Sequence, residues 1–173
     1  MASSIFRGDA PAIAGVLDFL FAGTWESTDV LTITINGKAV TQVGTGGTIA
    51  LTVTALYTLV AASTEPEYTE LTWTNPSAGV LKWVANTPGK PSTVTGTVAG
   101  GTGTQTPAVV SANSGISVYD IAANWTTAVP LVTDTIYLDN SNIPLLYDLS
   151  QAGATLAAGY IAQSFIGTVG LPK

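Results

Sequence analysis

The chain has 173 residues, enough for one large domain or two small ones. Charged residues make up only 9% of it, against roughly 25% in an average globular domain, and five basic and eleven acidic residues leave a net charge of −6. The complete lack of histidine and cysteine excludes disulfides, thiol and imidazole nucleophiles, Ser–His–Asp relays and Cys/His zinc sites.

The low and scattered charge also indicates which partners the chain is not expected to bind. Its basic residues are scattered, whereas a phosphate backbone needs clustered Lys and Arg, so the sequence predicts no nucleic-acid contact. The negative balance disfavours adsorption to an anionic membrane, and no apolar run reaches the length of about 18 residues that a spanning helix needs. A surface poor in charge is expected where other subunits cover it, and this predicts obligate assembly.

The clearest predicted element is a β-hairpin over residues 30–43. Apolar residues alternate with threonines over 31–35, which is typical of a strand. Asn36-Gly37 follows, and this dipeptide is preferred in a type I′ turn because both central residues need positive φ. Before the hairpin, residues 13–21 are rich in β-formers and stop at Gly23.

Residues 48–63 fit two patterns. Residues 49–55 alternate as in a strand, but apolar residues also recur at helical spacing across the segment, at Ile49, Val53, Leu56 and Val60. Thr48 in the N-cap position favours the helix. Strands are then predicted over 68–73, 80–85 and 92–98, separated by Pro- and Gly-containing turns.

The sequence from residue 99 changes character. Residues 99–107 form a Gly/Thr tract too poor in side chains to pack, so it is predicted to be a linker or an exposed loop, and it is taken as the domain boundary. Residues 108–173 contain short strand-like blocks about ten residues apart, each ended by Asn, Gly or Ser, which resemble coils of a β-solenoid. The predicted fold class is therefore mainly β: an α+β domain with one helix over 1–98, then solenoid-like strands over 108–173.

Several groups of residues have both a chemical and a structural interpretation. The tryptophans Trp25, Trp73, Trp83 and Trp125 could be platforms for sugars, but the pattern favours packing, with Trp73 and Trp83 as neighbours on adjacent strands. Gly44-Thr-Gly-Gly47 lacks the Lys-Ser/Thr ending of a phosphate-binding loop and is interpreted as a turn. The tripeptide Arg7-Gly8-Asp9 is too short to indicate receptor binding.

The carboxylates do not form a recognisable site in the sequence. Glu65, Glu67 and Glu70 lie around Pro66 at an element boundary, where acidic residues are usually solvated, and no partner completes a glycosidase pair. An oxygen-rich stretch does not match a calcium-binding repeat and is typical of solenoid turns, at Asp134, Asp139, Asn140, Asn142 and Asp148. The sequence therefore predicts no catalytic, cofactor or metal site, and no enzyme.

Two parts of the chain resemble large structural proteins of bacteriophages. Residues 8–98 carry a Gly-Asp-Ala-Pro-Ala opening (8–12), the hairpin Asp-Val-Leu-Thr-Ile-Thr-Ile-Asn-Gly-Lys (29–38) and the strand Pro-Gly-Lys-Pro-Ser-Thr-Val-Thr (88–95). Residues 113–172 carry Ala-Asn-Trp, Asp-Thr-Ile-Tyr-Leu-Asp-Asn and Gln-Ser-Phe-Ile-Gly-Thr-Val-Gly-Leu-Pro. The resemblance is to head-decoration, tail-fibre and adhesin proteins in which a small β-rich domain leads into a parallel β-helix.

This resemblance implies a function through contacts. It implies a virion structural protein, a capsid decoration protein or fibre-attachment module, forming a homotrimer and binding a major capsid or tail protein. The first seven residues lack the regions of a signal peptide, which favours release by lysis, or a piece of a longer chain. The candidate interface residues are aromatic: Phe19, Phe21, Tyr119, Tyr160 and Phe165. The alternatives are a glycan-binding adhesin and, as a third reading, a fragment of a polysaccharide depolymerase.

Overall fold

The computed structural model describes residues 2–146 and 156–170, which belong to two compact units. The sandwich unit comprises residues 15–87 and 93–112, and the solenoid unit comprises the described residues of 1–14, 88–92 and 113–172. The chain thus begins in the solenoid unit, forms the sandwich unit and returns. Residues 88–92 also belong to the solenoid unit, so the chain crosses between the units four times; the first and last crossings are adjacent, because Ile13 pairs with Ser114 in the solenoid unit and Val16 pairs with Ser111 in the sandwich unit.

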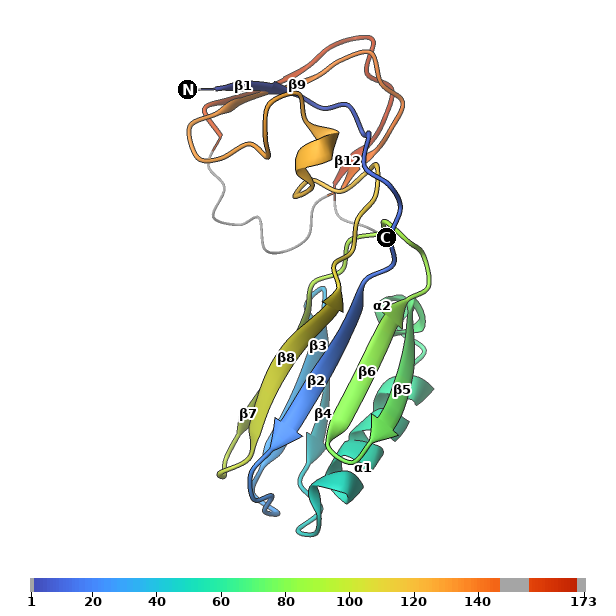
Figure 1. Cartoon of the computed structure of the whole chain (residues 1–173), viewed down its shortest axis with the longest axis vertical. Coiled ribbons are helices and arrows are strands. Elements are labelled where there is room, and N and C mark those ends of the chain that lie inside the picture. Colours follow the sequence, from blue (N-terminus) through green and yellow to red (C-terminus); the bar gives the residue numbers. More distant parts are fainter. Residues whose placement is uncertain (1, 147–155, 171–173) are drawn as a thin grey trace. The chain divides into compact units, whose positions relative to one another are not determined.

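The sandwich unit has two layers. One is a four-stranded antiparallel sheet in the order β5-β6-β2-β8, from Leu71–Ser77, Val80–Ala85, Val16–Ala22 and Thr104–Ser111. The other contains a three-stranded antiparallel sheet in the order β4-β3-β7, from Lys38–Val43, Val30–Ile35 and Val94–Ala99. Figure 1 shows this sheet and helix α1 (Ile49–Ala62) behind the four-stranded sheet. The mainly β fold class is confirmed.

The predicted hairpin is the β3–β4 pair. Ile35 lies opposite Lys38, and both turn residues have positive φ, 46° at Asn36 and 87° at Gly37, as a type I′ turn requires. Leu31, Ile33 and Ile35 are buried, whereas the intervening threonines lie on the outer face of the sheet. The alternation of apolar and polar residues therefore determines which face of β3 enters the core.

The helical interpretation of residues 48–63 is confirmed. Helix α1 buries Thr52, Val53, Leu56 and Val60 on the face that the spacing predicted. Thr48 is at the N-cap position with an extended backbone, but its side chain makes no capping hydrogen bond. The short helix α2 (Pro66–Thr69) follows and buries Tyr68, whose hydroxyl donates hydrogen bonds to the carbonyl oxygens of Ile33, at 2.7 Å, and Lys38, at 3.2 Å.

The prediction of a linker over residues 99–107 was wrong, whereas the alternative of an exposed loop holds for residues 100–103. Strand β8 begins at Thr104 and pairs with β2 along its length, so residues 100–103 are a tight turn between β7 and β8. The turn packs on Asp29, whose carboxylate accepts a hydrogen bond from the Gly103 N–H at 3.4 Å. The same carboxylate occupies the space that a side chain at position 101 would need. Glycines are required in this turn because the backbone lies so close to Asp29. The predicted domain boundaries, 1–98 and 108–173, do not match the two units that the structure shows.

The solenoid unit is built from parallel strands. β1 (Ser3–Ile5), β9 (Thr135–Leu138) and β11 (Ala158–Ile161) form one sheet in the order β1-β9-β11. β10 (Leu145–Leu146) and β12 (Val169–Gly170) form a second pair. Thr135 lies opposite Ala158 and Leu145 opposite Val169, so each coil repeats after 23 or 24 residues. This is the arrangement of a short parallel solenoid, as the sequence predicted for this region.

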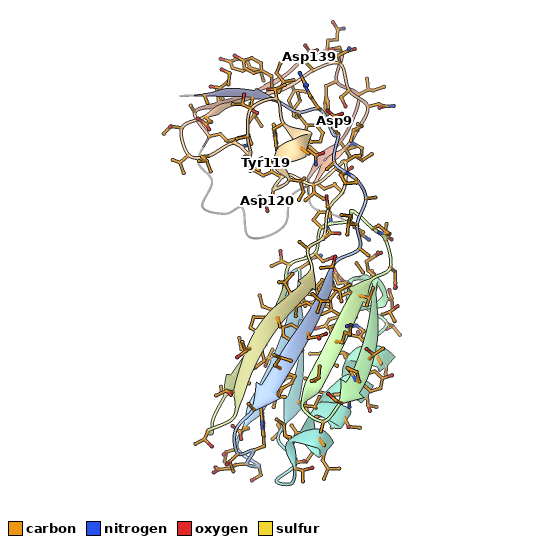
Figure 2. All side chains as sticks on the ribbon, viewed as in Figure 1. Asp9, Tyr119, Asp120 and Asp139 are labelled. Carbon is orange, nitrogen blue, oxygen red and sulfur yellow. The ribbon has the colours of Figure 1, made fainter. Side chains whose placement is uncertain are left out.

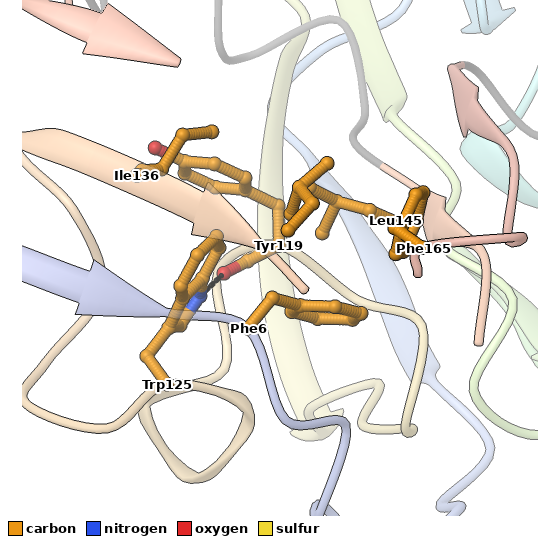
Figure 3. Close-up of a cluster of buried hydrophobic side chains, with 7 residues drawn as sticks. Phe6, Tyr119, Trp125, Ile136, Leu145 and Phe165 are labelled. Carbon is orange, nitrogen blue, oxygen red and sulfur yellow. Dashed lines mark hydrogen bonds between the residues drawn. The ribbon is translucent and has the colours of Figure 1, made fainter. Parts of the chain in front are cut away.

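Aromatic side chains fill the interior of the solenoid unit. The buried cluster contains Phe6, Tyr119, Trp125, Ile136, Leu138, Leu145 and Phe165. Figure 3 shows Trp125 between Phe6 and Tyr119, with edge-to-face ring contacts at 5.3 and 5.2 Å between centroids. The indole Nε1 of Trp125 donates a hydrogen bond to the Tyr119 carbonyl at 2.7 Å. The 3₁₀ turn η1 (Ala122–Asn124) leads into this cluster.

Candidate functional site

Most of the predicted interface residues lie inside the two units. Phe19 and Phe21 are core residues of the sandwich unit, and Tyr119 and Phe165 belong to the aromatic core of the solenoid unit. Their predicted role as surface contacts is corrected, because a side chain that fills the core of its own unit is not available to a partner. Tyr160 differs: 56% of it is exposed, on β11 of the solenoid unit.

The β1 edge of the parallel sheet is covered by the chain itself. The segment after η1 runs alongside β1: Ile5 donates its N–H to the Thr126 hydroxyl at 2.9 Å and accepts the Thr126 N–H at 3.0 Å. The Thr127 hydroxyl donates to the Ser3 carbonyl, and the Ser4 hydroxyl donates to the Ala128 carbonyl, each at 3.2 Å. This end of the solenoid is capped.

The opposite edge of the same sheet is formed by β11, which is an edge strand within the described residues. Among the residues that the structure describes, β11 pairs only with β9. The N–H of Ala157 bonds to the Asp134 carbonyl, so Ala157 faces β9. Because the backbone groups of successive residues in a strand point to opposite sides, Ala158 and Tyr160 direct theirs away from β9. Within residues 2–146 and 156–170, these backbone groups have no partner strand, and edge groups of this kind can pair with another strand.

The coil formed by residues 156–170 is uncharged and exposes apolar side chains. Residues 156–170 contain no Asp, Glu, Lys or Arg, although the whole chain carries a net charge of −6. Four large apolar side chains of this coil are substantially exposed: Tyr160, Ile161, Ile166 and Val169. Ile161 on β11 is the register partner of Leu138 on β9, and Leu138 is buried. Ile161 is 65% exposed, because no further coil covers it among the described residues. Apolar side chains that cluster on a surface are typical of contact surfaces.

An aromatic row crosses the outer face of the same sheet. Ile5, Tyr137 and Tyr160 are register partners on β1, β9 and β11 and are all exposed. The rings of Tyr137 and Tyr160 stack with centroids 5.1 Å apart and planes 12° from parallel. This stack lies beside the β11 edge and extends the apolar surface there.

A polar groove of the solenoid unit contains two exposed carboxylates. Asp9 and Asp139 line it (Figure 2), with Arg7, the amides of Asn140 and Asn142, two serines and Ile166. The Asp139 carboxylate accepts a hydrogen bond from the Ser164 hydroxyl. Within the Arg7-Gly8-Asp9 tripeptide, Gly8 is buried with φ 71° against Ile143, so packing explains the glycine.

Three other carboxylates, those of Glu65, Glu70 and Asp134, have structural partners. Glu65 pairs with Lys38 at 3.4 Å on the surface, and Glu70 accepts the Thr87 N–H at 2.9 Å. Asp134 accepts hydrogen bonds from the N–H groups of Ala2 and Leu131, which lower the pKa of its carboxyl group. No group of three acidic residues in 2–146 and 156–170 is arranged to hold a metal ion, and Asp148 lies outside those ranges.

The tryptophans are packing residues, as the sequence favoured. Each is at most 7% exposed, so none is available as a stacking platform for a sugar. Trp73 and Trp83 are direct register partners on β5 and β6, as predicted. Within the described residues, no helix is both long and apolar enough to cross a membrane.

Comparison of the chain with known protein families and with characterised proteins finds no match. The sequence reasoning missed the contrast between the covered β1 edge and the β11 edge of the solenoid. One signal for it was present: Thr-Ile-Tyr-Leu (135–138) and Ala-Gly-Tyr-Ile (158–161) place tyrosine at the same position 23 residues apart. The covering segment 125–128 had no comparable signal, because its bonds to β1 join parts of the chain that are over 100 residues apart.

Proposed function

We propose that this chain is a non-enzymatic structural protein of a phage particle, a capsid decoration protein or fibre-attachment module. It works by contacts with sister subunits, which we expect to form a homotrimer, and with a major capsid or tail protein. The observation that carries the proposal is the one-sided capping of the solenoid. A chain that closes one edge of a sheet and leaves an uncharged apolar coil at the other is suited to adding a neighbour at the open end.

The physical basis of such an assembly is the burial of apolar surface. Each Å² of apolar surface removed from water contributes about 25 cal/mol, and most of this gain is offset by the freedom that the partners lose. The low charge of the chain supports the same proposal, because few ionic groups have to be desolvated when neighbours cover it. The resemblance to phage structural proteins supplies the virion as the setting.

The test is co-sedimentation of the purified chain with empty capsids and with isolated tails of the phage that encodes it. We expect saturable binding to one of them. An Ile161→Asp variant, which places a charge at the open end, is expected to reduce binding at least tenfold. The matched control is Leu51→Asp, because Leu51 is similarly exposed but lies on α1 of the sandwich unit. Failure of the unmodified chain to bind either particle contradicts the proposal.

A second candidate function is glycan recognition, favoured by the groove of the solenoid unit. Carboxylate, amide and hydroxyl groups converge there next to an exposed isoleucine, a combination that suits a polar ligand with apolar faces. A glycan array probed with the soluble chain tests this function. Specific binding that is lost in Asp9→Ala and kept in Glu65→Gln, a surface change in the sandwich unit, would support it. A silent array combined with binding to empty capsids would reject it.

A further inference from the structure

We propose that Tyr137 and Tyr160 form an oxidative crosslinking site, at which a one-electron oxidant joins the two rings by a carbon–carbon bond. The product is a dityrosine that ties β9 covalently to β11. The proposal goes beyond the proposed function and does not depend on it, because it concerns a covalent modification within one chain. It rests on the position, the stacking and the accessibility of the two rings.

The parallel pairing of β9 and β11 brings the two tyrosines together. Tyr137 and Tyr160 are register partners, so their side chains leave the same face of the sheet from adjacent strands. Their rings stack with centroids 5.1 Å apart and planes 12° from parallel. The ring carbons beside the two hydroxyl groups can therefore meet after small rotations of the side chains. Within residues 2–146 and 156–170, no other two tyrosine rings are in contact.

Exposure selects the same two tyrosines for oxidation. Tyr137 is 37% exposed and Tyr160 is 56% exposed, so an oxidant in solution reaches both rings. Tyr68 and Tyr119 are buried, and their hydroxyl groups donate hydrogen bonds to backbone carbonyls, which keeps them from the oxidant. Tyr57 is partly exposed, but it lies on α1 of the sandwich unit, away from the stacked pair in the sequence and in the fold.

The reaction removes two hydrogen atoms in total, and a haem peroxidase with hydrogen peroxide supplies the oxidation. Each phenol gives one electron and its hydroxyl proton to the oxidised haem, which leaves two phenoxyl radicals. The radicals combine through the ring carbons next to their oxygens. The hydrogen on each of these carbons then moves as a proton to the neighbouring oxygen, which restores both phenols. Hydrogen peroxide takes up the two electrons and two protons and is reduced to two molecules of water.

A covalent bond at this place would join two successive coils of the solenoid unit. β9 and β11 are strands of four residues each, and the chain has no cysteine with which a disulfide could join them. The new bond closes a loop from residue 137 to residue 160, which restricts the unfolded chain. We therefore expect the crosslinked chain to need a higher urea concentration to unfold its solenoid unit.

The experiment is peptide mapping of the full chain after treatment with the peroxidase and hydrogen peroxide. A protease that cleaves before aspartate cuts the unfolded product at Asp134, Asp139 and Asp148. The peptides 134–138 and 148–173 then contain one tyrosine each, and Tyr147 is released on a separate peptide, 139–147. We expect mass spectrometry to find 134–138 joined to 148–173, with two hydrogen atoms missing. The joined fraction should not depend on protein concentration, because the reaction occurs within one chain.

Two variants and one change of conditions provide the controls. Tyr137→Phe keeps the ring but lacks the phenol, so the joined peptide should be absent. Tyr57→Phe removes a partly exposed phenol from the sandwich unit and should leave the yield unchanged. Oxidation of the unmodified chain in concentrated urea should lower the yield at least about tenfold, because unfolding separates the two rings. Coupling of N-acetyltyrosine in a parallel sample shows that the oxidant is active.

Three results overturn the crosslinking site. One is the lack of the joined peptide from the folded chain when the oxidant couples N-acetyltyrosine. Another is an equal yield in the folded and the unfolded chain. The third is a yield that falls in Tyr57→Phe as much as in Tyr137→Phe. A crosslinked chain that unfolds at an unchanged urea concentration would reject the stabilising role. Binding to particles is measured separately, so the crosslink and the proposed function can fail independently.

Discussion

The side-chain oxygen of Asn124 accepts a hydrogen bond from the backbone N–H of Ala10, at 2.9 Å, between residues 114 positions apart. The same side chain donates to the carbonyls of Gly115 and Val118, each at 2.7 Å, and Asn124 is completely buried. One amide therefore fastens the first residues of the chain to the part that follows the sandwich unit. Asn124 holds together a unit whose two halves are separated by a whole inserted domain.

Replacing Asn124 with alanine is expected to destabilise the solenoid unit by about 2–4 kcal/mol, because it leaves one buried N–H and two carbonyls without their partner. Asn124→Asp is expected to be at least as harmful at neutral pH, since an acceptor then faces two carbonyl oxygens. Urea unfolding followed by the NMR signal of the Trp125 indole N–H, which reports on the solenoid unit, measures both changes. A loss below about 0.5 kcal/mol in Asn124→Ala would show that the amide does not hold the two segments together.

The sandwich unit is expected to fold when residues 15–112 are expressed alone. Its ends, Val16 on β2 and Ser111 on β8, are register partners, so excision leaves both strands paired. The segment 1–98 that the sequence suggested as a domain is expected to fail, because it lacks β8 and leaves one side of β2 without its partner strand. Dispersed amide signals in a proton–nitrogen NMR spectrum would identify the folded fragment. A well-dispersed spectrum for 1–98 would contradict the insertion.

Stability is expected to fall at high pH because of Tyr68. Burial raises the pKa of Tyr68 to about 12, above the ordinary value of 10.0. The protonated phenol is therefore favoured in the folded state. This contribution is fully present below pH 10 and is lost as the pH rises from 10 through about 12. Denaturant unfolding at successive pH values measures it.

The Tyr68→Phe variant provides the control for this pH dependence. It removes the hydroxyl that bonds to the carbonyls of Ile33 and Lys38, so we expect a loss of about 1–2 kcal/mol at neutral pH. The variant should also show a shallower decline between pH 10 and 12. The decline in stability that remains in this variant is assigned to Tyr119, because burial also raises the pKa of its phenol. An unchanged decline would mean that Tyr68 is not the group responsible.

The turn between β7 and β8 is expected to be intolerant of side chains. Gly100 has φ 98°, and a methyl group there would overlap the Thr28 carbonyl. Gly100→Ala should therefore cost about 1–3 kcal/mol in thermal unfolding of the sandwich unit. Gly170→Ala is the control, because a methyl group there meets nothing within 4 Å. Equal melting temperatures for the two variants would contradict the strain assigned to this turn.

Local patterns in the sequence predicted local structure. The dipeptide Asn36-Gly37 predicted the β3–β4 turn because positive φ is a property of those two residues, and the spacing from Val53 to Val60 predicted the buried face of α1 because a helix repeats every 3.6 residues. The same spacing could not show that Phe19 and Phe165 belong to the cores of their own units, since an aromatic residue suits a core and an interface equally well.

By itself, the sequence determined the mainly β class, the hairpin, the helix and the absence of histidine and cysteine chemistry, because each depends on residue types and their spacing over a few positions. Only the tertiary structure decided that residues 100–103 turn on Asp29, that Ala10 bonds to Asn124, and that residues 126–128 cover the β1 edge of the solenoid. These features depend on which distant segments meet. Such pairings are set by the packing of the whole chain, so a pattern within one segment does not reveal them.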